Sequence, residues 1–422
     1  MHLLFIHQAF PAQFGRLALE LTTRYGWTCR VLVEALSHCP SPTREMIERL
    51  DIQRFTVPAE ARLHDEIPWP QLYGVWLHHC RAVFEAVRAR PELRPDLVVA
   101  HGARGPLALL LPELLSCPIV NYAEYYFAPS HADLSYRIDL PPAEPAQFFP
   151  RAINAPVLAG LIAADAAYSP TRWQRDSFPE RFRHKIDVHF DGIDTGLYRP
   201  HEVPAERVAG LLGGRAIPPG TRLVTYVARG LESMRGFDLF MKVADRIGRE
   251  RSDVLFVVVG SEDIYYGWDK LHTGQPSFKQ WVLSQGTYDL SRFLFLNHIA
   301  PEHLAHLLCL SDLHIHLTVP FAVSWSLLNA MACGCVVLAS DVPSVREFIA
   351  DGHTGLVEPL FDVDRLTGAA LRVLNNPEEF RPLGEAARRL IDERYSLDAV
   401  VPPLKAYFER VASRCPEIIE GG

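Results

Sequence analysis

Residues 222–236 read RLVTYVARGLESMRG and predict a buried strand followed by a glycine-containing loop. The first seven residues are mostly apolar, as in a strand that is covered on both faces of a parallel sheet. The next eight hold two arginines and two glycines, and the pattern of residues 237–249 then predicts a helix. A strand, a loop and a helix in this order form the repeating unit of α/β folds.

The same unit recurs in two series along the chain. In the first series we predict strands at residues 3–6, 29–33, 97–100, 118–122, 166–168 and 186–189, with helices at 14–24, 71–90 and 106–115. In the second we predict further strands at residues 254–259, 293–296, 313–317 and 336–339, with helices at 301–310, 326–333 and 342–350. The turn-rich segment DGIDTGLYRPHEVP, residues 191–204, separates the two series.

The two series predict an α/β protein with two Rossmann-like, doubly wound domains that face a central cleft. We expect the first domain over residues 1–196 and the second over residues 197–390. Residues 391–422 should form a C-terminal helix that packs back across the domains. Ligands of doubly wound sheets bind beyond the carboxyl ends of the strands, so we expect the functional site in the cleft.

Composition excludes several classes of protein. The 422 residues are 48% hydrophobic and 22% charged, as in ordinary globular proteins, and the net charge of −8 argues against a nucleic-acid partner. The N-terminus lacks a basic segment, and the longest apolar run is too short to span a bilayer, so we expect a cytoplasmic protein. Residues 362–364 read Asp-Val-Asp, but they precede a helical pattern and suit a helix cap; we therefore predict no metal site.

Arg229 and Arg235 are the first candidates for binding chemistry. They lie on a strand-to-helix loop, and guanidinium groups pair with phosphate oxygens in a bidentate geometry. They could form a diphosphate clamp, and the alternative is two surface arginines in ordinary ion pairs. Position alone leaves both interpretations open.

A second candidate segment is TVPFAVSWSLLNAMACG, residues 318–334. An apolar strand leads into a loop, and a helix follows from about Ser324. Backbone N–H groups at a helix start bind phosphates and sugar hydroxyls. Asn329 lies about one turn into this helix and could contact the same ligand, whereas a buried structural asparagine is the alternative.

With these motifs in place, the chain resembles the retaining glycosyltransferase family 4 group, whose fold is GT-B. Ala228-Arg229 and Arg235-Gly236 stand where the family usually has Gly-Arg and Lys-Gly, and NAMACG, residues 329–334, stands where it has EAMACG. The first domain resembles a bacterial branch of the family through four motifs: HQAFPAQF (7–14), SPTRWQ (169–174), DGIDT (191–195) and PFAVSWSLL (320–328).

The resemblance implies a role for each matching position. Arg229 and Arg235 would neutralise the donor diphosphate, and His101 would orient the transferred sugar, with a structural histidine as the alternative. The donor-binding positions would be Gly260, Phe321, Val323, Ser324, Trp325 and Asn329. The first-domain loop that holds Phe10, Phe14 and Gly15 would close on the donor and shape the acceptor pocket. Glu124 would bind acceptor or sugar hydroxyls, or else be structural.

Two positions depart from the family pattern. The family's Glu-x7-Glu signature is Phe321 and Asn329 in this sequence. Phenylalanine at the first position resembles the bacterial branch. Asparagine at the second position keeps one acceptor oxygen but loses the charge that would hold the donor ribose, which predicts binding weaker by about 1–2 kcal/mol.

The resemblance implies an enzyme that moves a sugar from a UDP- or GDP-type donor to an acceptor hydroxyl in polysaccharide, lipopolysaccharide or glycoconjugate biosynthesis. It implies no metal or other cofactor. A lipid-linked acceptor would bring the protein weakly to the inner face of the membrane. The alternative, which Asn329 favours, is a weak or inactive relative that binds a nucleotide sugar or a protein partner; a third reading keeps the fold but hydrolyses or epimerises the donor.

Overall fold

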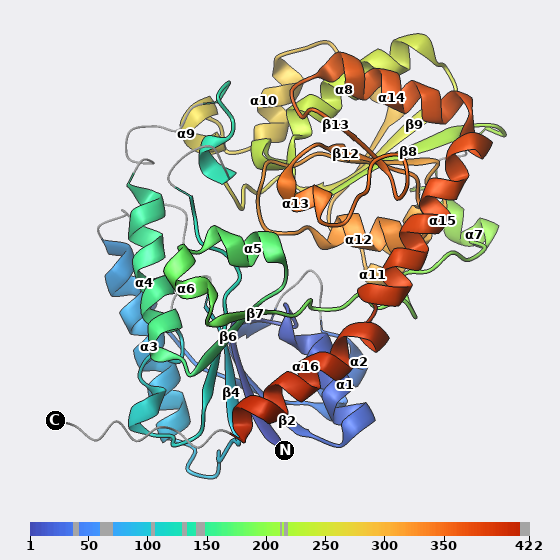
Figure 1. Cartoon of the computed structure of the whole chain (residues 1–422). Coiled ribbons are helices and arrows are strands. Elements are labelled where there is room, and N and C mark those ends of the chain that lie inside the picture. Colours follow the sequence, from blue (N-terminus) through green and yellow to red (C-terminus); the bar gives the residue numbers. More distant parts are fainter. Residues whose placement is uncertain are drawn as a thin grey trace. The chain divides into compact units, whose positions relative to one another are not determined.

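The computed structural model of the chain describes residues 1–36, 42–59, 71–102, 106–128, 133–140, 148–211, 213–214 and 218–413 (Figure 1). The chain divides into two compact units. Unit 1 comprises Met1–Pro129, Pro145–Gly192 and Leu397–Gly422, and unit 2 comprises Ser130–Glu144 and Ile193–Ser396. The chain therefore passes between the units more than once, and a short segment from its first half belongs to unit 2.

Unit 1 is built on a seven-stranded parallel sheet with the strand order β3-β2-β1-β4-β5-β6-β7. The central strands are buried on both faces, which explains their continuous apolar sequences. The strands are β1 (His2–Phe10), β2 (Thr28–Leu36), β3 (Asp51–Arg54), β4 (Leu97–His101), β5 (Ile119–Tyr122), β6 (Ala166–Ser169) and β7 (Ile186–Val188).

The helices of unit 1 cover this sheet. In Figure 1, α3 and α4 lie side by side, and α1 packs beside α16. The helices are α1 (Phe14–Tyr25), α2 (Arg44–Arg49), α3 (Leu72–Arg88), α4 (Phe149–Ala163), α5 (Arg172–Ser177), α6 (Glu180–Arg183) and α16 (Leu397–Ala412). The helix predicted at residues 106–115 is wrong, because only a 3-10 turn forms there, η3 (Leu111–Glu113). Pro112 has no N–H to donate, which disfavours a continuous α-helix.

Unit 2 is built on a six-stranded parallel sheet with the order β10-β9-β8-β11-β12-β13. The strands are β8 (Arg222–Gly230), β9 (Val254–Ser261), β10 (Phe293–Leu296), β11 (Leu313–His316), β12 (Val337–Ser340) and β13 (Leu356–Glu358). Counted from the first strand of each sheet, both units have the order 3-2-1-4-5-6 of Rossmann folds, and unit 1 adds β7 at the edge. The prediction of two doubly wound α/β domains is confirmed.

The helices of unit 2 form two groups. Figure 1 shows α8 and α14 above the sheet, and α11 and α12 below it. The α-helices are α7 (Ala205–Leu211), α8 (Phe237–Glu250), α9 (Asp269–Thr273), α10 (Phe278–Ser284), α11 (Pro301–Cys309), α12 (Trp325–Ala332), α13 (Pro343–Arg346), α14 (Val363–Asn375) and α15 (Pro377–Arg394). The 3-10 turns are η4 (Asp133–Ser135), η6 (Ser233–Arg235) and η7 (Leu290–Arg292).

The C-terminal helices are divided between the units. Helix α15 belongs to unit 2 and α16 to unit 1. That residues 391–422 pack across both domains stays a prediction, as does the central cleft. Within the described residues, no helix is both long enough and apolar enough to cross a membrane.

Candidate functional site

Each sheet reverses its strand order at one point, and most of the predicted site residues lie at or after the ends of the strands on either side of it; Glu124 instead follows β5, and Gly260 lies in β9. In unit 2, Arg229 and Arg235 lie at the end of β8 and in the loop after it, and residues 321–325 lie between β11 and α12. In unit 1, residues 11–13 join β1, which ends at Phe10, to α1, which begins at Phe14, and His101 ends β4. Doubly wound proteins bind their ligands at such points, because the loops on either side diverge there.

Arg235 is held in place by the turn that follows β8. It ends η6, and Gly236 then adopts a left-handed conformation with φ 64° before α8 begins. A Cβ atom on Gly236 would lie 2.7 Å from Leu317 Cβ, so only glycine fits this turn. The Arg235 carbonyl accepts a hydrogen bond of 2.7 Å from the Tyr226 hydroxyl. The backbone on both sides of the guanidinium is therefore fixed.

The Arg235 side chain is 8% exposed and yet lacks a carboxylate partner among the described residues. Its Nη1 donates to Thr318 Oγ1 at 3.1 Å. Its guanidinium lies 5.6 Å from the ring centroids of both Tyr266 and Phe321, whose rings are 5.1 Å apart. A buried arginine is normally paired with an anion. The arrangement therefore presents a positive charge that an anionic ligand can neutralise.

Arg229 is exposed and stacks on the neighbouring loop. Its guanidinium lies 4.1 Å from the ring centroid of Tyr265, a cation–π contact. The backbone N–H groups of Tyr265 and Tyr266 both donate to Glu232 Oε2, at 2.7 and 3.0 Å. Glu232 thereby ties the loop after β9 to the loop after β8. One buried carboxyl group thus sets the relative positions of the aromatic rings that contact the two arginines.

Two buried acids support this loop from inside unit 2. Burial raises the pKa of Glu232 to about 8, even though Arg235 and two backbone hydrogen bonds act in the opposite direction. Burial also raises the pKa of Asp269 to about 6. Asp269 Oδ2 accepts from the Ser233 N–H at 2.8 Å, and its other oxygen accepts from the Ser233 hydroxyl. Burial therefore favours the uncharged form of the Glu232 carboxyl beside Arg235.

The start of α12 lies in the second loop of unit 2. The helix begins at Trp325, and the Ser324 side chain shares a hydrogen bond of 2.8 Å with Ser326 instead of capping a backbone N–H. Val323, Ser324 and Trp325 are partly exposed, so a ligand can reach this helix start. Asn329 is 9% exposed and lies in the second turn of the helix.

Gly260 and Phe321 contribute by packing. A Cβ atom on Gly260 would lie 2.7 Å from Leu231 Cδ2 and 2.9 Å from the Ala228 carbonyl oxygen. Glycine therefore lets β9 approach the loop that holds Arg229. Phe321 is 4% exposed and supports Arg235 through its ring. In this structure both residues shape the loops, and direct donor contacts by either one stay a prediction.

His101 lies in an aromatic cluster at the carboxyl end of the sheet in unit 1. It is 3% exposed, and its ring stacks on Tyr122 at 5.2 Å and lies 4.2 Å from the ring of His7. Its Nε2 is 3.5 Å from Glu124 Oε2. The structure therefore brings together His101 and Glu124, two residues that the sequence analysis predicted separately.

A chain of hydrogen bonds fixes the Glu124 carboxyl. His7 Nδ1 accepts from the Ala9 N–H at 2.8 Å, so the ring proton is on Nε2, which donates to Gln13 Oε1 at 3.0 Å. The Gln13 amide then donates to Glu124 Oε1 at 2.8 Å. The donor and the acceptor of each hydrogen bond in this series are therefore defined, and the last acceptor is the Glu124 carboxylate beside His101.

The loop between β1 and α1 is packed tightly. Phe10 and Phe14 are 0% and 1% exposed, and the Phe14 ring lies 6.3 Å from that of His101. Gly15 donates its N–H to the Pro11 carbonyl at 2.7 Å, and a Cβ atom on Gly15 would lie 2.3 Å from Pro11 Cβ. The two phenylalanine side chains fill the interior in this structure, and their contact with an acceptor stays a prediction.

Sequence reasoning missed several residues that build these loops. Glu232 was passed over although it lies three residues before Arg235, and Tyr265 and Tyr266 were not among the predicted site residues. Gln13 lies inside the HQAFPAQF motif, but its link to Glu124 spans 111 residues. The motif marked the position of Gln13 but not its partner.

The Asp-Val-Asp segment is a helix cap, as predicted. Asp362 Oδ1 accepts from the Arg365 N–H at 3.0 Å, and α14 begins at Val363. Over the part of the chain that the structure describes, no group of three His, Cys, Asp or Glu side chains is arranged to hold a metal ion.

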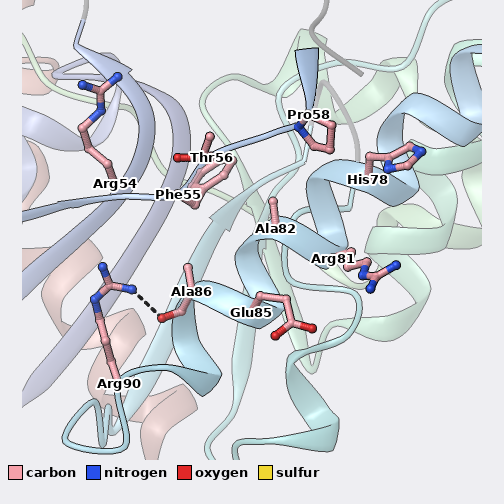
Figure 2. A pocket seen from close by; sticks show the side chains of 10 residues that line it. All are labelled: Arg54, Phe55, Thr56, Pro58, His78, Arg81, Ala82, Glu85, Ala86 and Arg90. Carbon is pink, nitrogen blue, oxygen red and sulfur yellow. Dashed lines mark hydrogen bonds between the residues drawn. The ribbon is translucent and has the colours of Figure 1, made fainter. Parts of the chain in front are cut away.

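A pocket of about 490 Å³ in unit 1 is separate from these residues (Figure 2). It lies between the segment that follows β3 and helix α3, and none of the predicted site residues lines it. Its lining residues are Arg54, Phe55, Thr56, Pro58, His78, Arg81, Ala82, Glu85, Ala86 and Arg90. Arg90 donates to the Ala86 carbonyl, as Figure 2 shows, and Arg54 donates to that of Glu34. We do not assign this pocket to the candidate site.

Comparison with protein families matches both halves of the chain. Residues 42–198 match the "Glycosyl transferase family 4 group", and residues 214–390 match "Glycosyl transferases group 1". Together the two matches cover most of the chain: the first includes β3 to β7 of unit 1, and the second includes all strands of the sheet in unit 2.

Individual proteins resemble this chain over most of their length. The alpha-D-kanosaminyltransferase of Streptomyces kanamyceticus is 24% identical over 81% of this chain and 84% of its own. The lipopolysaccharide core biosynthesis mannosyltransferase LpcC of Rhizobium leguminosarum bv. viciae is also 24% identical, over 81% and 83%. Anabaena HepE, solved in complex with UDP-glucose, superposes with a TM-score of 0.69 at 16% identity and covers 97% of this chain and 100% of HepE. The expected GT-B fold is confirmed.

Proposed function

Because the chain belongs to the family 4 group of glycosyltransferases, we propose that it transfers a sugar from a UDP- or GDP-type nucleotide donor to an acceptor hydroxyl. The transfer would retain the anomeric configuration and need no metal ion. It would serve polysaccharide, lipopolysaccharide or glycoconjugate biosynthesis, in line with the names of the relatives. The UDP-glucose bound by HepE supports a nucleotide sugar as donor.

The observation that carries this proposal is the buried charge of Arg235, which has no ion-pair partner in the part of the chain that the structure describes. Among the described residues, its guanidinium donates to Thr318 and contacts two aromatic rings, and it forms no ion pair. A donor diphosphate would supply the missing anion, and guanidinium groups bind phosphate oxygens through charge-assisted hydrogen bonds. Because the rings exclude water, the interaction gains strength relative to one in solvent. The nearby start of α12 offers backbone N–H groups to the same anion.

Arg229 and Arg235 would then stabilise the leaving group. In the transfer step the bond between the sugar C1 and the diphosphate oxygen breaks, and a bond forms between C1 and the acceptor oxygen. The acceptor hydroxyl proton passes to the leaving diphosphate on the same face of the sugar. Negative charge grows on the diphosphate during this step, so fixed guanidiniums favour the transition state over the ground state.

In unit 1, His101 and Glu124 would bind hydroxyl groups of the sugar or the acceptor. The hydrogen-bond chain through Gln13 keeps Glu124 oriented as an acceptor, 3.5 Å from the imidazole Nε2 of His101. In this role they orient the reacting sugar, which favours transfer because a correctly oriented substrate needs less rearrangement to react. The acceptor hydroxyl proton would still pass to the leaving diphosphate and not to His101 or Glu124.

Asn329 supports a second candidate function. It is buried in α12 at the position where the family has a glutamate, and it lacks the carboxylate that would hold the donor ribose. A protein with weakened donor contacts could act as a nucleotide-sugar-binding or partner-binding module without rapid turnover. Binding without transfer would favour this alternative.

Calorimetry with UDP-, GDP- and ADP-sugars, followed by an assay for nucleotide release, tests both functions. We expect one donor class to bind, Arg229→Ala to abolish its use, and the control Arg249→Ala to leave it unchanged. Arg249 lies at the other end of α8 from the loop that carries Arg229, pairs with Asp245, and has a side chain that is 73% exposed. If no nucleotide sugar binds, sugar transfer and nucleotide-sugar binding are both refuted, and only a partner-binding role is left. Normal turnover by the Arg229 variant would remove the clamp. NMR of the product anomer decides retention.

A further inference from the structure

A short segment from the first half of the chain is part of unit 2. Residues 133–140 belong to this unit, although the stretches of chain before and after it, Met1–Pro129 and Pro145–Gly192, belong to unit 1. The segment begins with the 3-10 turn Asp133–Ser135 and contains Arg137, which is 3% exposed. Arg137 is thus a buried arginine that is separated in sequence from the rest of unit 2, which begins at Ile193.

The Arg137 guanidinium uses all five of its N–H donors. Nε donates to Asp139 Oδ1 at 2.9 Å, and Nη2 donates to Asp139 Oδ2 at 2.7 Å and to Asp238 Oδ2 at 2.8 Å. Nη1 donates to Asp238 Oδ1 at 3.0 Å and to the Ser233 carbonyl at 2.8 Å. Two carboxylates, each accepting two hydrogen bonds, and one carbonyl thus use all the donors of the planar guanidinium. Among side chains, only arginine offers donors in this arrangement.

These partners lie on both sides of Arg235. Ser233 begins η6, two residues before Arg235, and Asp238 is in the first turn of α8, three residues after it. Arg137 therefore spans the short turn that carries the unpaired guanidinium. Its contact with the Ser233 carbonyl complements that of Asp269, which accepts from the Ser233 N–H.

The same segment also reaches the second loop of unit 2. The Asp133 N–H donates to the Pro320 carbonyl at 3.0 Å, directly before Phe321. Tyr136 stacks on Phe361 with ring centroids 5.8 Å apart, and Arg137 lies 5.8 Å from the same ring. Residues 133–140 therefore contact both the loop that carries Arg235 and the loop that carries Phe321, whose ring lies beside Arg235.

We propose that Arg137 is a positioning residue for the donor loop, residues 229–236, and through it for Arg235. The proposal rests on the proposed function for its effect on the donor. Arg137 itself has no donor left for a ligand and acts only by fixing the turn. A lysine in its place has three donors on one nitrogen and cannot satisfy two carboxylates and a carbonyl in the same plane. The turn would then lose one of its restraints.

Arg137→Lys and Arg137→Met test the proposal, with Arg292→Lys as the matched control. Arg292 also links a carboxylate, that of Asp289, to backbone carbonyls of unit 2, namely Gly248 and Arg251. It lies next to the beginning of β10, whereas the donor loop follows the end of β8. The control therefore removes a similar set of bonds without touching the donor loop.

Two measurements on the full chain are compared at a temperature well below each variant's unfolding. Hydrogen exchange of peptides from residues 229–240 reports the loop without any ligand, and calorimetry reports the donor dissociation constant. We expect faster exchange in this loop and a donor dissociation constant raised by about tenfold in Arg137→Lys, and by more in Arg137→Met. In the nucleotide-release assay, the KM for the acceptor should stay near its wild-type value.

Each outcome bears on the proposal. Unchanged exchange at residues 229–240 in a folded Arg137→Lys protein overturns it, whether or not any donor binds. Equal effects of Arg292→Lys on the loop also overturn it, because they would reflect general loosening. If the wild type binds no nucleotide sugar but exchange rises only in the Arg137 variants, the proposed function fails while the positioning of the loop stands. Should Arg137→Met fail to fold, Arg137→Lys alone decides.

Discussion

Replacing Glu232 by glutamine should remove a large pH dependence from the stability of the protein. Glu232 is 0% exposed; its Oε2 accepts two backbone hydrogen bonds, and its Oε1 has no hydrogen-bond partner among the described residues. Burial raises its pKa from 4.5 to about 8. Glutamine is nearly isosteric, and its carbonyl can accept the same two backbone N–H groups.

The direction and size of this pH dependence follow from the linkage between proton binding and folding. Between pH 4.5 and about 8 the folded protein holds the Glu232 proton more tightly than the unfolded chain does. The free energy of unfolding therefore falls as pH rises through this window, by about 1.4 kcal/mol for each pH unit. Over the whole window the loss is on the order of 5 kcal/mol, and above pH 8 it stops growing. The glutamine variant has no such proton and lacks this loss.

Urea denaturation of both proteins from pH 5 to pH 8.5 measures the effect. The difference in unfolding free energy, Glu232→Gln minus wild type, should rise with pH by several kcal/mol, whatever its value at pH 5. Other titrating groups, including Asp269, are present in both proteins and largely cancel. The control Glu378→Gln, at a side chain that is 79% exposed, should give a flat difference. A flat difference for Glu232→Gln would refute the reasoning that burial keeps this carboxyl protonated.

Three further predictions concern the donor, unit 1 and metals. Asn329→Glu should tighten donor binding by about 1–2 kcal/mol, about tenfold, because a carboxylate accepts stronger hydrogen bonds from ribose hydroxyls; unchanged or weaker binding in calorimetry would contradict the ribose role. Gly15→Ala should lower the unfolding free energy by about 1–3 kcal/mol, because the new methyl group would lie 2.3 Å from Pro11 Cβ. Thermal denaturation checks this against Gly74→Ala, where nothing lies within 4 Å of the added Cβ. Treatment with EDTA should leave transfer unchanged, and a loss that added Mg²⁺ or Mn²⁺ restores would refute metal independence.

Local patterns predicted most of the fold. The strand expected at residues 222–228 is β8 (Arg222–Gly230), and the helix expected at 14–24 is α1 (Phe14–Tyr25). Parallel strands buried on both faces leave continuous apolar runs, which are readable without knowledge of their neighbours. Sequence reasoning did not predict the short strands β3 and β13 or the longer helix α4 (Phe149–Ala163). It was wrong about a helix at residues 106–115, whose apolar pattern is interrupted by prolines, and it made α13 too long, since that helix covers only Pro343–Arg346.

The sequence by itself determined the two α/β series, their order, and the loop that carries Arg229 and Arg235, because these depend on residues near each other along the chain. Tertiary structure alone decided that Arg235 is buried without a carboxylate partner among the residues that the structure describes, that Glu232 is buried, and that Arg137 reaches Asp238 across 101 residues. The physical reason is that burial and ion pairing depend on which distant groups exclude water from a charge. No local pattern records that property, so the residues most tightly bound into the candidate site were the ones that sequence reasoning passed over.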